Sequence, residues 1–312
     1  MSTVDADIEV AQIPVTSPGV ELTGAREARV GAMTVHRMLP LRQRRSVGAW
    51  CFADHYGPLS VDGSAGMRVP PHPHIGLQTV TWLLSGDVLH TDSLGSEQLI
   101  RPGELNLMTA GRGIAHAEVS TLPPERARED HTLHGVQLWV ALPDRSRRTE
   151  PSFEHHSDLP VLGAGGLRAT VFMGALGGAR SPALAFTGIV GAELAADAGT
   201  SGVIPLLPAY EHVVFAAAGS AQVAGTALAP GSMLYLGTGR EHLPVTAKAG
   251  TRLILLGGEP LGEQLLMWWN FVARSPAEIA AAAADWREGR YAPVAGYDGD
   301  PMPAPPLGRL RA

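Results

Sequence analysis

Short runs of hydrophobic residues, separated by turn residues, fill the first half of the chain after residue 30. Many of these runs are rich in β-branched and aromatic residues and end at Gly or Pro, a pattern that predicts short strands joined by turns. Short strands at this spacing are typical of a β barrel or a β sandwich, so we expect an all-β fold. The expected strands cover residues 78–84, 88–93, 97–101, 104–108 and 135–143.

An earlier apolar run, residues 48–53, contains the single cysteine of the chain, Cys51. Cys51 is expected to be a small buried hydrophobe rather than a nucleophile, and one cysteine allows no intramolecular disulfide. The next residues, Asp-His-Tyr-Gly-Pro at 54–58, predict a turn. We interpret His55 as part of that turn, with a contact to a nearby functional site as the alternative.

The second half of the chain repeats the turns of the first half. Gly86 and the Pro-Gly pair at 102–103 have counterparts in Gly219 and the Pro-Gly pair at 230–231. The hydrophobic positions after each Pro-Gly pair also correspond, which indicates an internal duplication with a period of about one small β domain. A chain of 312 residues is long enough for two such domains, each with its own core.

The C-terminal region contains a clear helix signal. Ser275 is a candidate N-cap, Pro276 occupies the first helical position, and Glu278 completes a capping box. Gly289 can end the helix after an alanine-rich stretch. The apolar residues 267–271, just before the helix, are expected to pack against a barrel.

These features divide the chain into three expected segments. Residues 1–25 are polar and weakly patterned, so we expect an extended N-terminal arm. Residues 26–145 are expected to form the first β-barrel domain. Residues 146–312 are expected to form a second β-barrel domain that ends in the short helix.

Two pairs of residues in the first domain have the spacing of neighbours on one face of a strand. His72 and His74 flank Pro73, and prolines here disfavour a helix and favour an extended chain. His116 and Glu118 repeat the spacing. Because residues two apart on a strand point to the same side, three imidazoles and one carboxylate can converge if the two strands oppose one another.

We therefore interpret His72, His74, His116 and Glu118 as candidate metal ligands. Nitrogen and oxygen donors without thiolate suit iron, manganese, nickel, copper or zinc. Four protein ligands leave two positions open on a six-coordinate metal, which favours chemistry or ligand exchange over a closed structural zinc site. A single His-x-His pair would favour ordinary, partly buried histidines, whereas two such pairs favour a metal.

The second half lacks these ligands. His242 corresponds to His116, but Pro244 stands where the carboxylate would be. His212 does not align with either histidine of the first pair. We expect His212 and His242 to be structural remnants, so that each chain binds one metal.

Composition and charge limit the partners. Lys and Arg total 24 against 30 for Asp and Glu, a net charge of −6, so there is no basic excess for nucleic acid. No uncharged apolar run is long enough to cross a membrane, and the first 25 residues lack a secretory signal pattern. We expect a cytoplasmic protein without a nucleic-acid or membrane partner.

The histidines at 131, 134, 155 and 156 are expected to have surface or capping roles.

Several motifs resemble the pirin family of bicupins, over a region from Arg29 to Tyr291. The resemblance implies two cupin β barrels that face one another and a single metal in the N-terminal barrel. Iron(II) is the expected metal, with manganese, nickel, cobalt, copper and zinc as alternatives. The motifs are the two ligand pairs, His72-x-His74 and His116-x-Glu118, and the segments 49–58, 74–83, 92–95, 108–118 and 135–140.

The resemblance implies two alternative functions. The first is a metal-dependent dioxygenase that resembles quercetin 2,3-dioxygenases and acts on a small aromatic substrate, a flavonol such as quercetin. The second is a non-enzymatic, metal-containing regulator that binds a partner protein. An enzyme needs a cleft above the metal with room for an aromatic ligand, whereas a regulator is expected to have a shut cleft and an exposed contact patch.

Glu118 is the candidate catalytic residue for the enzyme alternative. It is the only acidic residue among the four candidate ligands, so it is the candidate base for the substrate hydroxyl. The alternative is a ligand that only balances charge. Many relatives carry Arg and Glu directly after the His-Pro-His motif, where this chain has Ile75 and Gln78, which changes the charge beside the site.

Overall fold

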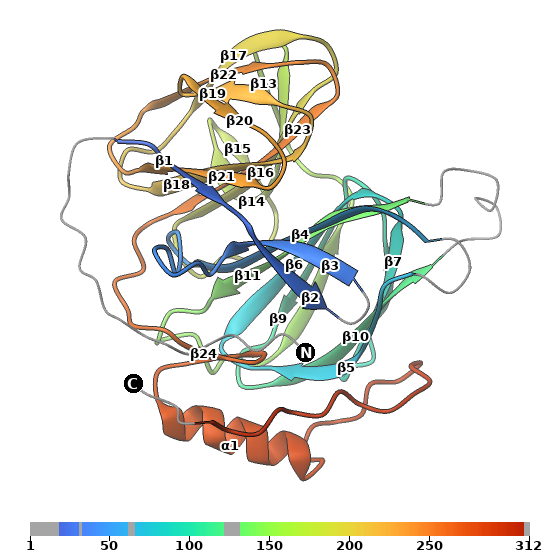
Figure 1. Ribbon diagram of the computed structural model, residues 1–312. Coiled ribbons are helices and arrows are strands. Elements are labelled where there is room, and N and C mark those ends of the chain that lie inside the picture. Colours follow the sequence, from blue (N-terminus) through green and yellow to red (C-terminus); the bar gives the residue numbers. More distant parts are fainter. Residues whose placement is uncertain (1–18, 31–32, 62–65, 122–131, 309–312) are drawn as a thin grey trace.

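The computed structural model describes residues 19–30, 33–61, 66–121 and 132–308 of the chain. In these ranges the chain forms short strands in two barrels and a single α-helix, as expected for an all-β protein. The barrels are stacked on one another, and the helix lies at the far end of the first barrel (Figure 1). No helix in the described ranges is long and apolar enough to cross a membrane.

The first barrel contains a seven-stranded and a four-stranded sheet. The seven-stranded sheet has the order β12-β9-β6-β11-β4-β3-β2, and the four-stranded sheet has the order β5-β10-β7-β8. Its strands include all those expected from the sequence. They are β2 (Arg26–Val30), β3 (Met33–Leu39), β4 (Trp50–Ser60), β5 (Arg68–His74), β6 (Leu77–Ser85), β7 (Asp87–Asp92), β8 (Glu97–Ile100), β9 (Leu105–Thr109), β10 (Ile114–Thr121), β11 (Thr132–Ala141) and β12 (Ser152–His156).

The second barrel has a similar plan. Its larger sheet has the order β1-β21-β18-β23-β16-β14-β13, with β15 paired to β14, and its smaller sheet has the order β17-β22-β19-β20. Gly86 after β6 and Gly219 after β18 both have positive φ, at 81° and 68°, in line with the expected duplication. The strands are β1 (Glu21–Gly24), β13 (Val161–Ala164), β14 (Leu167–Leu176), β15 (Ala179–Arg180), β16 (Ile189–Ala196), β17 (Thr200–Pro205), β18 (Glu211–Ala218), β19 (Ala221–Val223), β20 (Thr226–Leu228), β21 (Ser232–Gly237), β22 (His242–Ala247) and β23 (Thr251–Gly258).

Each barrel has an edge strand that comes from outside the segment expected to form that barrel. β12, which follows residue 146, pairs with β9 in the first barrel, and β1, from the expected N-terminal arm, pairs with β21 in the second barrel. These pairings satisfy backbone groups that an open sheet edge would leave unpaired. The expected division after residue 145 stays a prediction, and residues 1–18 of the expected arm lie outside the described ranges.

The prediction of a turn at residues 54–58 is wrong, because strand β4 continues through these residues to Ser60. Gly57 has φ of +85°, and a Cβ there would lie 2.2 Å from the carbonyl oxygen of Leu133. The facing strand β11 shifts register between Leu133 and Gly135, so the glycine accommodates an irregularity within the sheet. His55 is accordingly a buried strand residue, and it contacts the buried His134 with 2.8 Å between their Nε2 atoms.

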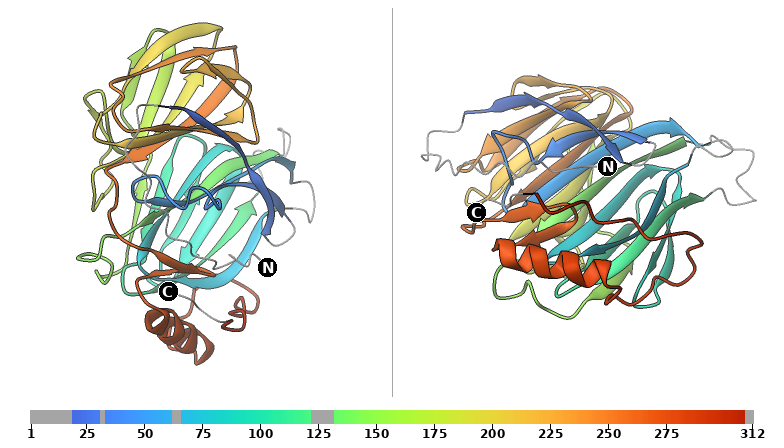
Figure 2. Two further views of the ribbon diagram at one scale, coloured as in Figure 1. Left: turned by 60° about the vertical axis from the view of Figure 1, so that its left-hand side comes forward. Right: turned by 60° about the horizontal axis from the view of Figure 1, so that its bottom comes forward.

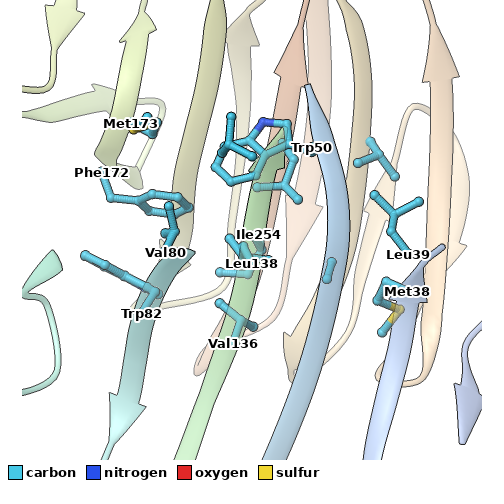
Figure 3. Packing of buried hydrophobic residues seen from close by; sticks show 14 of the residues in the cluster. Met38, Leu39, Trp50, Val80, Trp82, Val136, Leu138, Phe172, Met173 and Ile254 are labelled. Atoms are coloured by element: carbon cyan, nitrogen blue, oxygen red, sulfur yellow. The ribbon is translucent and has the colours of Figure 1, made fainter. Parts of the chain in front are cut away.

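A shared hydrophobic cluster joins the two barrels. Phe172 of the second barrel stacks on Trp82 of the first with ring centroids 5.0 Å apart, and it contacts Trp50 edge to face (Figure 3). The indole Nε1 of Trp50 donates to the carbonyl oxygens of Val190 and Gly257, at 3.0 and 3.1 Å. One hydrophobic cluster therefore spans both barrels, and the indole N–H of Trp50 within it is paired.

Replacing Phe172 with alanine should lower the free energy of unfolding by about 3–5 kcal/mol, because it leaves a cavity between two tryptophans. Chemical denaturation would measure the loss. Val161→Ala is the control, because Val161 is 52% exposed and its truncation should change stability by no more than about 0.5 kcal/mol. Equal losses from the two substitutions would contradict a shared core.

The C-terminal helix α1 (Pro276–Arg287) begins as expected, with Ser275 as N-cap and a capping box to Glu278. Gly289 follows it with φ of +68°. The hairpin of β24 (Leu266–Trp268) and β25 (Phe271–Ala273) packs between the helix and the first barrel, as expected for residues 267–271. The chain then turns back along the first barrel (Figure 2), where the N–H of Met302 donates to the carbonyl of Pro71 at 2.8 Å.

Candidate metal centre

Three neighbouring strands of the first barrel bring polar side chains together. In the small sheet, β10 lies between β5 and β7, so His116 is opposite His72 on one side and opposite Asp92 on the other. Glu118 is opposite His90 on β7. β5 is an edge strand, which explains how it tolerates three prolines that cannot donate to a ladder.

His72, His74 and His116 each place one ring nitrogen within 4.8 Å of those of the other two, and all three residues are buried. The Nδ1 of His72 is 2.8 Å from the carbonyl oxygen of Pro70, and the Nδ1 of His74 is 2.9 Å from that of Asn270. A carbonyl only accepts, so each Nδ1 carries the proton and each Nε2 has a free lone pair.

The three imidazoles suit a metal ion. The Nε2 atoms of His74 and His116 lie 3.1 Å apart, so two lone pairs would face one another unless a cation or a proton lies between them. Burial lowers the pKa of His72 to about 4 and holds the pKa of His74 and His116 well below their usual range. All three are therefore neutral at pH 7, the form in which imidazole binds metals.

Glu118 lies in a second group of candidate ligands, with His90 and His116. Its carboxylate oxygen Oε1 accepts a hydrogen bond from the hydroxyl of Thr81 at 3.1 Å. Burial raises the pKa of Glu118 above its ordinary value, although the electrostatic interaction with His90 and the hydrogen bond from Thr81 act in the opposite direction. A carboxylate in this setting accepts a proton more readily than one in water.

Sequence reasoning missed His90. His90 and Asp92 have the same two-residue spacing as the two predicted pairs, so the signal was present in β7. His134, for which we expected a surface or capping role, is buried beside His55, because β11 lies in the middle of the large sheet. His131 lies outside the described ranges.

A cavity of about 390 Å³ opens onto the three histidines and Glu118. Its walls are largely apolar, and Trp139 contacts His74 edge to face with ring centroids 5.1 Å apart. The hydroxyl of Tyr56 is buried in the wall and has no hydrogen-bond partner among the described residues. The C-terminal segment contributes Met302, and the β24–β25 turn contributes Trp269.

Comparison with known proteins identifies the family. The family model Pirin matches residues 32–140, and the model described as the Pirin C-terminal cupin domain matches residues 191–292. The chain belongs to the pirin family. The two barrels are therefore its N-terminal and C-terminal cupin domains, as the motifs led us to expect.

Three relatives cover most of the chain. The protein PA1205 of Pseudomonas aeruginosa, provisionally named a quercetin 2,3-dioxygenase, is 45% identical over 91% of this chain and 89% of its own. A crystal structure of a quercetin 2,3-dioxygenase from Acinetobacter baumannii is 42% identical, with a TM-score of 0.88, and the match covers 94% of this chain and 97% of that one. A pirin-like protein of Caulobacter vibrioides is 38% identical over 85% of this chain and 92% of its own.

The C-terminal cupin contains two isolated histidines. Among the described residues, the groups of side chains suited to a metal all lie in the N-terminal cupin. His212 is buried on β18, and neither of its ring nitrogens has a hydrogen-bond partner of normal geometry among the described residues. His242 is exposed on β22. Their interpretation as structural remnants remains a prediction.

Replacing His212 with leucine should make the protein more resistant to acid. Burial lowers the pKa of His212 to about 4, whereas an unfolded histidine has a pKa of about 6.5. The unfolded chain therefore binds an extra proton between these values, and stability that is complete above pH 6.5 is lost as the pH falls to 4. Relative to wild type, His212→Leu should gain up to about 3 kcal/mol between pH 7 and pH 4.

Denaturation at several pH values would measure this difference. His242→Leu is the matched control, because it makes the same substitution at an exposed position of the same barrel. A stability difference between His212→Leu and wild type that is constant from pH 7 to pH 4 would show that His212 does not stay neutral in the folded protein.

Proposed function

We propose that this pirin is a metal-dependent dioxygenase that acts on flavonols such as quercetin. The observation that carries the proposal is the cavity above the histidine cluster. Its volume of about 390 Å³ lies within the range of about 300–1,000 Å³ that is usual for small-molecule sites. The names of the Pseudomonas and Acinetobacter relatives support the same substrate class.

We propose His72, His74, His116 and Glu118 as the ligands of one divalent metal per chain. The free Nε2 lone pairs of the first two residues and the buried, neutral state of the three imidazoles support this set. Iron(II) is the proposed metal, and manganese, nickel, cobalt, copper and zinc are the alternatives, because each accepts nitrogen and oxygen donors. A bound divalent metal would supply Lewis acidity that lowers the pKa of a substrate hydroxyl.

The side chains of the cavity would bind the substrate and take its proton. Trp139 and the other apolar groups of the wall would hold the flat rings of the substrate and exclude water. The unpaired hydroxyl of Tyr56 is available to donate to a substrate oxygen, which would satisfy a buried polar group. Glu118 would take the hydroxyl proton of the flavonol, because it is the only acidic side chain among the four proposed ligands.

The regulator alternative requires a shut cleft above the metal. The described residues leave a cavity there, with a largely apolar wall and an unpaired tyrosine hydroxyl. These features favour a small aromatic ligand over a site used only for protein contact.

Titration of metal-loaded protein with quercetin tests the proposal directly. We expect a change in the flavonol absorption band that saturates at one quercetin per chain, together with quenching of tryptophan fluorescence by the ligand beside Trp139. Met33→Trp, which places a larger side chain in the cavity wall, should weaken quercetin binding without loss of metal. Absence of binding by the metal-loaded wild type would contradict the proposed substrate class.

A further inference from the structure

A third pair of buried polar residues, His90 and Asp92, lies directly beside the candidate ligands. Both are on β7, and their side chains are 4% and 0% exposed. The Nδ1 of His90 is 3.4 Å from the Nδ1 of His116, and the Nε2 of His90 is 3.2 Å from the Oδ2 of Asp92. We propose that Asp92 and His90 form a relay of hydrogen bonds that holds His116 in the tautomer that binds metal.

The relay begins at Asp92, whose charge state is fixed by its own contacts. Its Oδ1 accepts from the backbone N–H groups of Leu94 and Ser96, at 2.9 and 3.0 Å. Although burial alone would raise the pKa of Asp92, these hydrogen bonds and the one from His90 lower it below the ordinary value. Asp92 is therefore an ionised acceptor at neutral pH.

Because Asp92 is an acceptor, the directions of the Asp92–His90 and His90–His116 hydrogen bonds are determined. The carboxylate of Asp92 can only accept, so the Nε2 of His90 carries the proton and donates to it. In the tautomer that carries its proton on Nε2, His90 has a lone pair on Nδ1 and accepts there from the Nδ1–H of His116. His116 is consequently unprotonated at Nε2, the atom that lies 3.1 Å from the Nε2 of His74.

His116 needs such a partner more than the other two histidines do. The tautomers of His72 and His74 are fixed by the backbone carbonyls of Pro70 and Asn270, which have no alternative state. Among the described residues, the hydrogen-bond partner of the Nδ1 of His116 is another imidazole, which could donate or accept. Asp92 removes this ambiguity, much as a carboxylate orients a metal-binding histidine through a direct hydrogen bond.

The contacts of His90 argue for a positioning role rather than ligation. Both of its ring nitrogens have partners, and its ring stacks on Phe153 with centroids 4.4 Å apart and planes 16° from parallel. The stacking fixes the ring plane, and the two hydrogen bonds fix its rotation. A nitrogen of His90 could reach a metal only by breaking one of these bonds.

Three variants test the relay, which rests on the proposed metal centre. Asp92→Asn keeps an oxygen for the backbone N–H groups but can turn a donor toward His90, which would reverse both hydrogen bonds. His90→Phe keeps the stacking on Phe153 and removes both bonds. His90→Asn keeps an acceptor near the position of Nδ1 and so should partly rescue the function. His242→Phe is the matched control in the other barrel.

Co(II) titration followed by its visible absorption gives the first measurement. Loss of an orienting hydrogen bond typically weakens metal affinity about 10–100-fold. We expect a loss of this size for Asp92→Asn and His90→Phe, a smaller loss for His90→Asn, and none for His242→Phe. Affinities of Asp92→Asn and His90→Phe within twofold of wild type would overturn the proposal. His90→Phe could instead lose Co(II) affinity as completely as His116→Ala does, with a visible spectrum that shows one nitrogen ligand fewer. That result would identify His90 as a ligand and would also overturn the relay.

The tautomer of His90 gives a second measurement that needs no metal. Long-range nitrogen–proton NMR correlations on histidine-labelled, metal-free protein distinguish the two ring nitrogens, and His90→Phe assigns the signal. We expect His90 to carry its proton on Nε2 in wild type and on Nδ1 in Asp92→Asn. A proton on Nδ1 of His90 in wild type would overturn the relay. Failure of wild type to bind Co(II) would instead contradict the proposed metal centre, so the two failures are distinguishable.

Discussion

Replacing His116 with alanine should reduce the metal content from close to one per chain to near zero. His116 lies between β5 and β7 at the centre of the site, and it belongs to both groups of candidate ligands. Its removal should therefore weaken affinity by more than the roughly 100-fold that loss of an outer hydrogen bond costs. Elemental analysis of protein purified without chelator measures the effect.

The matched control is His242→Ala, a histidine on the corresponding part of the second barrel. It should retain the metal fully, and equal loss from both variants would contradict a single site in the N-terminal cupin. The His116→Ala protein should keep its far-ultraviolet circular dichroism, because two barrels with a shared apolar core do not depend on a metal as a zinc finger does. Collapse of that spectrum would show that metal and fold are coupled.

Replacing Glu118 with glutamine should reduce oxygen consumption with quercetin by about 10²–10⁴-fold, the usual contribution of a well-placed general base. Glutamine has nearly the same shape and keeps one oxygen, so much of the metal should remain. The hydroxyl of Thr81 can still donate to that oxygen, so the side chain should keep its orientation. The assay compares oxygen uptake per bound metal in the two proteins.

Normalisation to bound metal separates the two roles of Glu118. If Glu118 is only a ligand, activity and metal content should fall together, and the rate per metal should stay near that of wild type. Thr81→Val is a useful second variant, because it removes the hydrogen bond to Glu118 but leaves the carboxylate in place. We expect it to lower the rate per metal by less than Glu118→Gln does.

Local patterns predicted the strands that carry the candidate ligands. The two-residue spacing of each histidine pair depends only on strand geometry, and the prolines around His72 excluded a helix, so β5 and β10 were predictable before any tertiary contact was known. The capping box at Ser275 was predictable for the same reason, since its hydrogen bonds join residues three apart.

Features that depend on distant parts of the chain were not predictable. The glycine and proline at 57 and 58 resemble a turn, and their true environment is set by Leu133, on a strand that lies far away in sequence. The pairing of β1 with β21 and of β12 with β9 also joins distant segments. His90 was missed for another reason, because its spacing partner is an aspartate and its importance appears only once β7 lies beside β10.

Oxygen uptake by the wild-type protein with quercetin tests the central claim most directly. The protein would be stripped of metal, loaded separately with iron(II), manganese, nickel, cobalt or copper, and compared with metal-free protein and with His116→Ala treated in the same way. We expect quercetin-dependent oxygen consumption in at least one loaded wild-type form and in neither control. No oxygen consumption with any flavonol in any loaded form would contradict the dioxygenase and favour the metal-containing regulator.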